Sequence, residues 1–266
     1  MSEAVRAVVL AAGRGTRLRP HTDDRPKCML PFAGRRLIDW QLSALRANGV
    51  SDVALVGGYR AEALAPLGLP LWENPRWSET NMVHTLFCAR PVLESGDSVV
   101  VSYGDIVYEP RVVEALLGTA GDIVVVVDRN WLPLWRTRAE DPLDDAESLR
   151  IDGTGRLRDI GRKVSTLGEI EAQYIGLMRF TPAGARKLAE FHARAGDGAD
   201  WLIGRTLDTC YMTDLLRGMI EAGHDLHAAT IEGGWLEFDT SSDLAAYEGL
   251  RERNALDPFF RIDAFA

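Results

Sequence analysis

The sequence predicts an α/β fold built on a Rossmann-like, doubly wound mixed β-sheet, and three observations carry that prediction. Short runs of apolar, β-branched residues recur along the first half of the chain. Amphipathic patterns about ten residues long, typical of helices, lie between these runs. Glycines follow several runs, where a strand would turn toward the next helix. The chain has 266 residues, 46% of them hydrophobic, which is enough to bury the core of such a sheet.

The first half of the chain alternates predicted strands with predicted helices. Val5–Ala12 is the first strand, an apolar run that ends at the turn residue Gly13. Similar runs predict strands at Val53–Val56, Ser98–Ser102 and Ile123–Val127. The helical patterns between them cover Leu37–Asn48, Thr80–Leu93 and Pro110–Leu117. Such sheets bind ligands beyond the carboxyl ends of their strands, which here include Gly13 and the pair Gly104-Asp105.

Residues 129–150 interrupt this alternation with two tryptophans, two prolines and an acid-rich run. We interpret them as a lid-like insertion on the acceptor side of a single domain, residues 1–266. The turn Asp152–Gly155 then predicts a hairpin. The remaining predicted elements are the hairpin strands Ser148–Ile151 and Leu157–Ile160, a strand Ala172–Phe180, helices Pro182–Ala195 and Met212–Ala222, a strand pair Leu226–Ile231 and Trp235–Phe238, and a last helix capped by Thr240 or Ser241.

The composition excludes several classes of function. The net charge of −9 disfavours binding to nucleic acid or to an anionic membrane. No run approaches the roughly 18 apolar residues of a membrane span, and the first residues lack the pattern of a signal peptide. We therefore expect a cytoplasmic protein with no nucleic-acid or membrane partner. Its three widely spaced cysteines predict reduced thiols, since they fit neither a disulfide framework nor a metal knuckle.

The charge is concentrated in an unusual way. Residues 1–36 contain eight arginines or lysines and three acidic residues, a local charge of +5 that leaves −14 for the rest of the chain. One basic loop on an otherwise acidic protein indicates a small anionic ligand at that loop.

This basic loop has the residue types that phosphate binding requires. It reads Leu10-Ala-Ala-Gly-Arg-Gly-Thr-Arg-Leu-Arg-Pro20 and continues as Arg25-Pro-Lys-Cys-Met-Leu-Pro-Phe-Ala-Gly34. Gly13 and Gly15 let backbone amides approach phosphate oxygens, Arg17 offers several donors, and Lys27 supplies a compact positive charge. The pattern is neither GxGxxG nor GxxxxGK[ST].

The full pattern resembles the signature of the nucleotidyltransferases that activate sugar phosphates and small phosphorylated alcohols, which reads GxGTRLxP and then PKxMLPxxG. The resemblance implies a GT-A-like nucleotidyltransferase fold. It also implies that Arg17 and Lys27 are catalytic, neutralising charge on the triphosphate and on the transferring phosphoryl group. The positions it assigns to the nucleotide are Leu10, Ala11, Ala12, Gly13, Gly15, Thr16, Arg17, Thr80, Asn81 and Gly104.

The same resemblance implies a metal site. In these enzymes an aspartate after the fourth strand and another near the C-terminus hold Mg²⁺ on the nucleotide, and Asp105 and Asp239 match those positions. Two carboxylates at strand ends suit Mg²⁺, which prefers oxygen ligands. An aspartate after a strand is otherwise more often a turn or cap residue, just as Asn81 is equally suited to begin a helix.

Several tracts look like the cytidylyltransferase branch that acts on phosphocholine and phosphonates. They are residues 73–82, Asn130-Trp131, Trp135–Glu147 and Trp235–Asp239. The implied partners are CTP and a small phosphonate, such as phosphonoformate or 2-aminoethylphosphonate, or a phosphate monoester. The implied reaction is in-line attack of the acceptor oxygen on the α-phosphorus of CTP, with release of pyrophosphate and no general base.

The acceptor is assigned less directly. Lys163 matches a family lysine that grips the acceptor phosphate. Arg129, Arg136 and Arg138 would bind an acidic acceptor, whereas Trp131 and Trp135 would enclose a quaternary ammonium group. Glu171 and Tyr174 precede a strand whose counterpart in the family faces the acceptor.

Other functions share much of this pattern. A phosphocholine cytidylyltransferase, a sugar-1-phosphate uridylyl- or thymidylyltransferase, and a non-catalytic regulatory nucleotide-binding subunit all stay open. The oligomeric state stays open too, because the aromatic side chains of residues 251–266 would pack either on the domain or on a second copy in a homo-oligomer.

Overall fold

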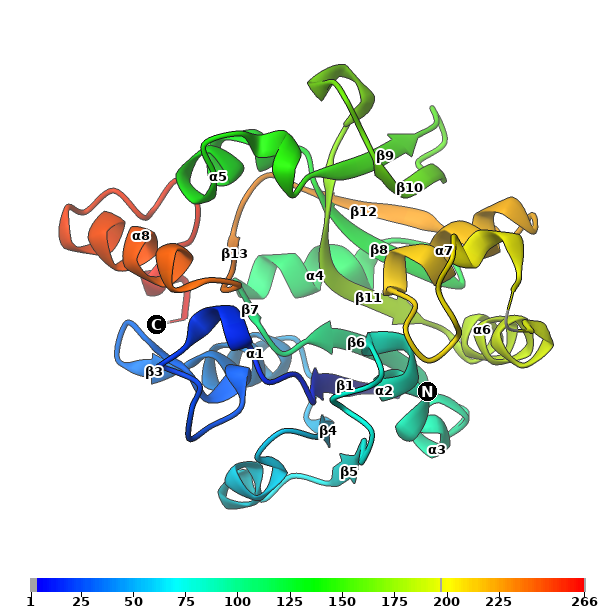
Figure 1. The fold of residues 1–266 in the computed structure, drawn as a ribbon, viewed down its shortest axis with the longest axis horizontal. Helices are drawn as coiled ribbons and strands as arrows, with labels where there is room; N and C mark the ends of the chain where they lie inside the picture. Colours follow the sequence, from blue (N-terminus) through cyan, green and yellow to red (C-terminus); the bar gives the residue numbers. More distant parts are fainter. Residues whose placement is uncertain (1–3, 197, 266) are drawn as a thin grey trace.

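A seven-stranded sheet forms the centre of the computed structural model, which describes residues 4–196 and 198–265 (Figure 1). The strand order is β12-β8-β11-β6-β1-β4-β5, and β11 runs antiparallel to both neighbours while the other pairs are parallel. The predicted α/β class with a mixed sheet is confirmed. The strands are β1 Val5–Ala11, β4 Asp52–Gly57, β5 Leu71–Glu73, β6 Ser98–Tyr103, β8 Ile123–Asp128, β11 Gln173–Phe180 and β12 His227–Ile231.

Helices cover both faces of this sheet. Successive residues of β1 point to opposite faces, so Ala7 and Val9 belong to one hydrophobic core, and Val8 and Leu10 to the other. The first core contains residues of α1 Leu37–Ala47, α4 Pro110–Gly118, α5 Trp131–Arg138 and α8 Ser241–Glu252. The second contains residues of α2 Met82–Cys88, α3 Arg90–Leu93, α6 Pro182–Arg194 and α7 Met212–Glu221.

Three small sheets flank the central one. They are β2 Pro31–Phe32 with β3 Arg35–Arg36, β7 Ile106–Tyr108 with β13 Trp235–Glu237, and β9 Glu147–Ile151 with β10 Leu157–Lys163. The β9–β10 pair is the predicted hairpin. The predicted cap of the last helix is also confirmed, because the Thr240 hydroxyl accepts a hydrogen bond from the Asp243 backbone amide at the start of α8.

Two sequence predictions were wrong in detail. The helix predicted over Thr80–Leu93 is two helices separated at Ala89, since Pro91 has no amide proton with which to continue α2. The predicted pair Leu226–Ile231 and Trp235–Phe238 does form two strands, but they do not pair with each other. β12 extends the central sheet beside β8, whereas β13 pairs with β7, and Gly233 and Gly234 turn the chain between them at positive φ.

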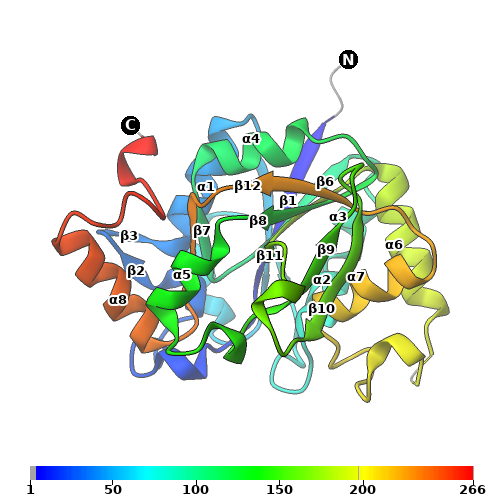
Figure 2. The same ribbon diagram turned by 90° about the horizontal axis from the view of Figure 1, so that it is seen from above.

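The segment predicted to be lid-like is anchored to the core at its start. Trp131, Leu134 and Trp135 of α5 are buried, and the Trp135 ring lies 6.0 Å from that of Trp235. Figure 2 shows α5 beside α8 at one end of the molecule. Movement of this segment as a lid stays a prediction.

The C-terminal aromatic residues pack on the domain itself. Phe260 is fully buried, and the Phe265 ring lies 4.8 Å from that of Trp40. Ala266 lies outside the described residues. The three cysteines are free thiols, as predicted. Among the helices of the described chain, none has the length and apolar character needed to cross a bilayer.

Candidate functional site

Two clefts open at the carboxyl edge of the sheet, one small and one large. The small cleft has an empty volume of about 600 Å³, and the large cleft about 1810 Å³. Met82 and Tyr103 line both, so the two clefts adjoin. The predicted residues that line the small cleft are Leu10, Ala11, Ala12, Gly13, Lys27, Thr80, Asn81, Gly104 and Asp105.

Glycines allow the segments around the small cleft to approach one another. A Cβ at Gly104 would lie 2.7 Å from the Leu10 carbonyl oxygen, so only glycine fits where β6 ends beside β1. Gly15 has φ +66, and a Cβ there would lie 3.2 Å from Cγ of Lys27. Gly15 and Thr16 do not line the cleft; they form the turn that brings the basic loop back toward Lys27.

A hydrogen-bonded loop forms the opposite wall. The fully buried Asn74 side chain donates to the hydroxyls of Thr80 and Thr85 at 2.9 and 3.0 Å. Asn81 caps α2: its side-chain oxygen accepts from the Met82 amide at 3.0 Å. The helix-start role that the sequence left open for Asn81 is therefore present, and the same residue also lines the cleft. Trp77 and Cys28 line this cleft too; both lie in tracts that carry the family resemblance, but neither was predicted as a site residue.

A cluster of charges lies where the two clefts meet. The Lys27 ammonium is 2.7 Å from a carboxylate oxygen of Asp105 and 2.6 Å from one of Asp239. These residues come from the basic loop, the β6–β7 connection and the end of β13, so the fold brings together three distant predicted residues. Asp105 lines the small cleft and Asp239 the large one. Arg17, whose guanidinium is 3.4 Å from Asp239, also lines the large cleft.

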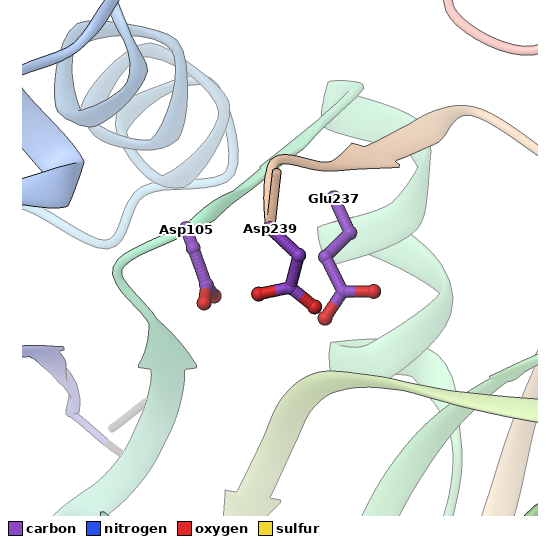
Figure 3. Close-up of side chains that lie close together, drawn as sticks. All are labelled: Asp105, Glu237 and Asp239. Atoms are coloured by element: carbon purple, nitrogen blue, oxygen red, sulfur yellow. The ribbon is translucent and has the colours of Figure 1, made fainter. Parts of the chain in front are cut away.

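Glu237 is a third carboxylate in this cluster, and the sequence reasoning missed it. Oxygen atoms of Asp105, Glu237 and Asp239 lie within 4.8 Å of one another. Figure 3 shows the three carboxyl groups side by side, two of them from the end of β13. Glu237 is the last residue of β13 and Asp239 follows two residues later, so the short spacing between these two acidic residues was the available signal.

Arg138 holds this cluster from α5 and lines neither cleft. Its side chain is 6% exposed, and its guanidinium lies 2.7 Å from Glu237, 3.5 Å from Asp239 and 3.4 Å from Asp243. Asp145 is 3.8 Å away. A guanidinium with several donors can bridge more than one carboxylate, which keeps these acidic groups together inside the protein.

The charges of the cluster do not cancel. Five carboxylates (Asp105, Asp145, Glu237, Asp239, Asp243) surround three basic groups (Arg17, Lys27, Arg138), a formal charge of −2. Burial lowers the pKa of Lys27, but attraction to Asp105 and Asp239 outweighs it and leaves the pKa above its usual value. Burial raises the pKa of Glu237, against the attraction of Arg138.

This donor set fits a hard divalent cation. One oxygen of Asp105, Oδ1, is buried and has no hydrogen-bond partner within the described chain. Three converging carboxylates, an excess of negative charge and an unpartnered oxygen suit an ion such as Mg²⁺.

The large cleft is lined by charged groups of both signs. Lys163 and Tyr174 line it, as expected of acceptor residues. The Lys163 ammonium donates to the backbone oxygens of Leu143 and Asp144 at 2.7 and 3.0 Å. Glu147, Arg205 and Asp214 also line it, and the sequence reasoning did not identify them.

Besides Arg138, four residues predicted to bind the acceptor line neither cleft. Trp131 is 4% exposed and packs on Trp135 in the core. Arg129 and Arg136 are exposed outside the two clefts. Glu171 accepts a hydrogen bond from the Ile151 amide, at the far end of the β9–β10 hairpin.

Residues 7–167 of the chain match the family model of the MobA-like NTP transferase domain. The chain belongs to this family. The resemblance found in the basic loop is thereby confirmed, and the small cleft lined by that loop lies within the matched residues.

Two relatives within this family are informative. The chain is 36% identical over 248 residues to CTP:phosphoglutamine cytidylyltransferase of Campylobacter jejuni. The aligned residues cover 90% of this chain and 97% of that protein. It is 31% identical to CMP-5'-(3-aminopropyl)phosphonate synthase of Streptomyces rubellomurinus over 90% of this chain and 37% of that protein. The structure of CTP:phosphocholine cytidylyltransferase from Streptococcus pneumoniae aligns with a TM-score of 0.69 at 21% identity, over 94% of this chain and 99% of that one, which shows that the fold is shared.

Proposed function

We propose that this member of the MobA-like NTP transferase family is a cytidylyltransferase that transfers CMP from CTP to a small acceptor bearing an anionic phosphoryl group. The observation that carries the proposal is the Lys27–Asp105–Asp239 cluster at the junction of the two clefts. A reaction between two bound molecules needs its charged groups at the place where they meet. Its relatives at 36% and 31% identity are cytidylyltransferases or make a CMP conjugate.

In this mechanism the small cleft holds CTP and the large cleft holds the acceptor. An anionic oxygen of the acceptor attacks the α-phosphorus of CTP, a new P–O bond forms, and the bond to the β-phosphate breaks to release pyrophosphate. The nucleophile is already ionised, so no side chain has to remove a proton.

The chain contributes positioning and charge. Amides of the Gly13 loop face the phosphates, Arg17 neutralises charge on the leaving pyrophosphate, and Lys27 stabilises the transferring phosphoryl group. Asp105, Glu237 and Asp239 would hold Mg²⁺, which would supply charge neutralisation on the triphosphate when bound.

The large cleft favours an acceptor that carries a cationic nitrogen. The Glu147 carboxylate lines it and has no ion-pair partner among the described residues. Lys163, the cross-strand neighbour of Glu147, donates to backbone oxygens instead of to that carboxylate. Burial, together with the nearby Asp214 and Asp145, raises the pKa of Glu147 in spite of a hydrogen bond from Thr213 and the charge of Arg217. A cation next to Glu147 would relieve this cost.

The molecules named for the two relatives support an acceptor with a cationic nitrogen. Phosphoglutamine, an N-phosphorylated amino-acid amide, and 3-aminopropylphosphonate each carry an amino group as well as an anionic phosphoryl group. We propose such aminated acceptors for this chain, the phosphoramidate phosphoglutamine first and aminoalkylphosphonates second. Phosphonoformate lacks a cationic nitrogen and ranks below both.

The test is pyrophosphate release with Mg²⁺ and each of CTP, UTP, dTTP, ATP and GTP. Each nucleotide is paired with phosphoglutamine, 2-aminoethylphosphonate, phosphocholine, phosphonoformate and glucose-1-phosphate. We expect release with CTP and an aminated acceptor. Release only with UTP or dTTP and the sugar phosphate would overturn both the proposed acceptor class and the proposed preference for cytosine. No release with any pair would support a regulatory subunit.

A further inference from the structure

Lys27 lies at the place where a divalent cation would bind. Its ammonium contacts Asp105 at 2.7 Å and Asp239 at 2.6 Å, two of the three carboxylates that converge within 4.8 Å. All three side chains are largely buried, with exposed fractions of 14% for Lys27, 20% for Asp105 and 15% for Asp239. The ammonium is thus a resident cation between the carboxylates, held without solvent between the charges.

An ammonium and a divalent cation cannot share this position. Both are small cations that need the same carboxylate oxygens, and at such short range they repel each other strongly. Asp105 has one further oxygen free of hydrogen bonds within the described chain, and Glu237 is held by Arg138 beside the pair. The remaining ligands for a larger charge are therefore in place, whereas the ammonium satisfies only two carboxylates.

We propose that Lys27 and a divalent cation occupy this carboxylate site in turn, with Glu237 as the third carboxylate ligand of the cation. In the absence of metal the ammonium keeps the acidic groups together. When the metal binds, the ammonium leaves Asp105 and Asp239. Lys27 lines the small cleft, so the released ammonium stays within reach of the triphosphate. Only this last step rests on the proposed function.

The exchange is tested with Mn²⁺ as the probe, without nucleotide or acceptor. Mn²⁺ affinity is measured by electron paramagnetic resonance or calorimetry for the wild type, Lys27→Met and Glu237→Gln. We expect Lys27→Met to bind Mn²⁺ about tenfold more tightly or better, because the competing charge is gone. Glu237→Gln should bind it about tenfold more weakly, because a ligand is lost.

Lys163→Met is the matched control, since it removes a lysine charge from the same cleft system without removing an ion pair to a carboxylate. Its Mn²⁺ affinity should stay within about twofold of the wild type. A Lys27→Met variant that binds Mn²⁺ no better than wild type would overturn the exchange, and an unchanged affinity in Glu237→Gln would remove Glu237 from the ligand set.

Thermal unfolding and a crystal structure give readouts that do not depend on activity. In EDTA, Lys27→Met should melt at a lower temperature than the wild type, and Mn²⁺ should raise its melting temperature by more. Crystals of the wild type soaked in Mn²⁺ should show the metal on the carboxylates and the Lys27 ammonium moved away from them. Mn²⁺ on this site with Lys27 still bridging Asp105 and Asp239 would contradict the proposal. Because no turnover is measured, failure of the proposed function would not affect these outcomes.

Discussion

The two clefts are built from different kinds of residue. The small cleft is formed mainly by backbone and short side chains at the ends of β1 and β6 and at the start of α2, together with Lys27 of the basic loop and the larger side chains of Trp77, Met82 and Tyr103. The large cleft is formed by long charged side chains of the β9–β10 hairpin, the residues before it and the start of α7. In the proposed function, the shape of the strand ends would hold the nucleotide, whereas charges on a later part of the chain would select the acceptor.

The junction between the clefts should be the most sensitive point. We expect Lys27→Ala to lower kcat by about 10²–10³-fold, as the loss of one preorganised donor at the transferring group does in other enzymes. Circular dichroism should show an intact fold. Turnover measured with saturating CTP and acceptor checks this, and a kcat equal to that of the wild type would separate Lys27 from the chemistry.

A change in the shape of the small cleft should affect CTP and leave the acceptor site intact. In Gly104→Ala, the new Cβ would lie 2.7 Å from the Leu10 carbonyl oxygen, so the ends of β6 and β1 must move apart. We expect a loss of about 1–3 kcal/mol in the free energy of unfolding. The KM for CTP should rise more than the KM for the acceptor.

Gly118→Ala provides the control for this prediction. Gly118 lies in the last position of α4, and an added Cβ there would meet no atom within 4 Å. This variant should be as stable as the wild type or slightly more stable. Equal CTP affinities for the two alanine variants would mean that the approach of β6 to β1 does not shape the nucleotide site.

A charge change in the large cleft should raise the KM for the acceptor and leave the KM for CTP nearly unchanged. We expect Glu147→Gln to raise the KM for 2-aminoethylphosphonate about tenfold, with little change for ethylphosphonate, which has no ammonium group, or for CTP. Glu190→Gln, an exposed change on α6, should alter none of these values. Equal effects on the two phosphonates would assign Glu147 a structural role.

Glu147 also predicts a pH dependence. Its pKa is raised, so as the pH falls the carboxylate is protonated earlier than an ordinary glutamate, and the KM for the aminated acceptor should rise at that pH. The same shift means that the folded state disfavours the ionised form. Glu147→Gln should therefore stabilise the free protein slightly at neutral pH, a gain that disappears at a pH low enough to protonate Glu147 in both the folded and unfolded states. A pH profile identical to that of the wild type in Glu147→Gln would contradict this assignment.

The smallest expected effect concerns the wall of the small cleft. Asn81→Ala removes the cap of α2 and should lower the free energy of unfolding by about 1 kcal/mol. Asn81→Ser keeps a capping oxygen and should regain most of that stability, as measured by urea unfolding. If the serine variant is as unstable as the alanine variant, the cap is not what Asn81 contributes to the helix.

The fold was largely predictable because its signals are local. The runs at Val5–Ala12 and Ile123–Val127 are apolar on both faces, as strands in the middle of a covered sheet must be. One error was local, because Pro91 ends the helix predicted over Thr80–Leu93. The other arose where pairing depended on a distant partner. Nothing near Trp235 indicates that its strand pairs with β7, because its partner Tyr108 lies far away along the chain.

The acceptor site was predicted less well for a related reason. Trp131 and Trp135 are the kind of residue that can bind a quaternary ammonium, but burying a large aromatic ring in the core is also favourable. α5 buries both rings, and Trp131 lines neither cleft, whereas Trp135 still lines the large cleft. Glu147 was not identified because a single glutamate next to a predicted strand has no local signature. Its lack of an ion-pair partner is visible only with the neighbouring elements in place.

The sequence by itself determined the sheet and the basic loop, and the family signature in that loop led to the prediction of Asp105 and Asp239 as metal ligands. These follow from short-range patterns, since apolar periodicity, turn glycines and a spaced signature are all readable along one stretch of chain. Only the tertiary structure decided that Glu237 joins the carboxylates, that Arg138 holds them from α5, and that the Lys27 ammonium lies between Asp105 and Asp239. Such contacts join residues separated by 78 to 212 positions, and their energies depend on distance and burial, which a linear sequence does not contain.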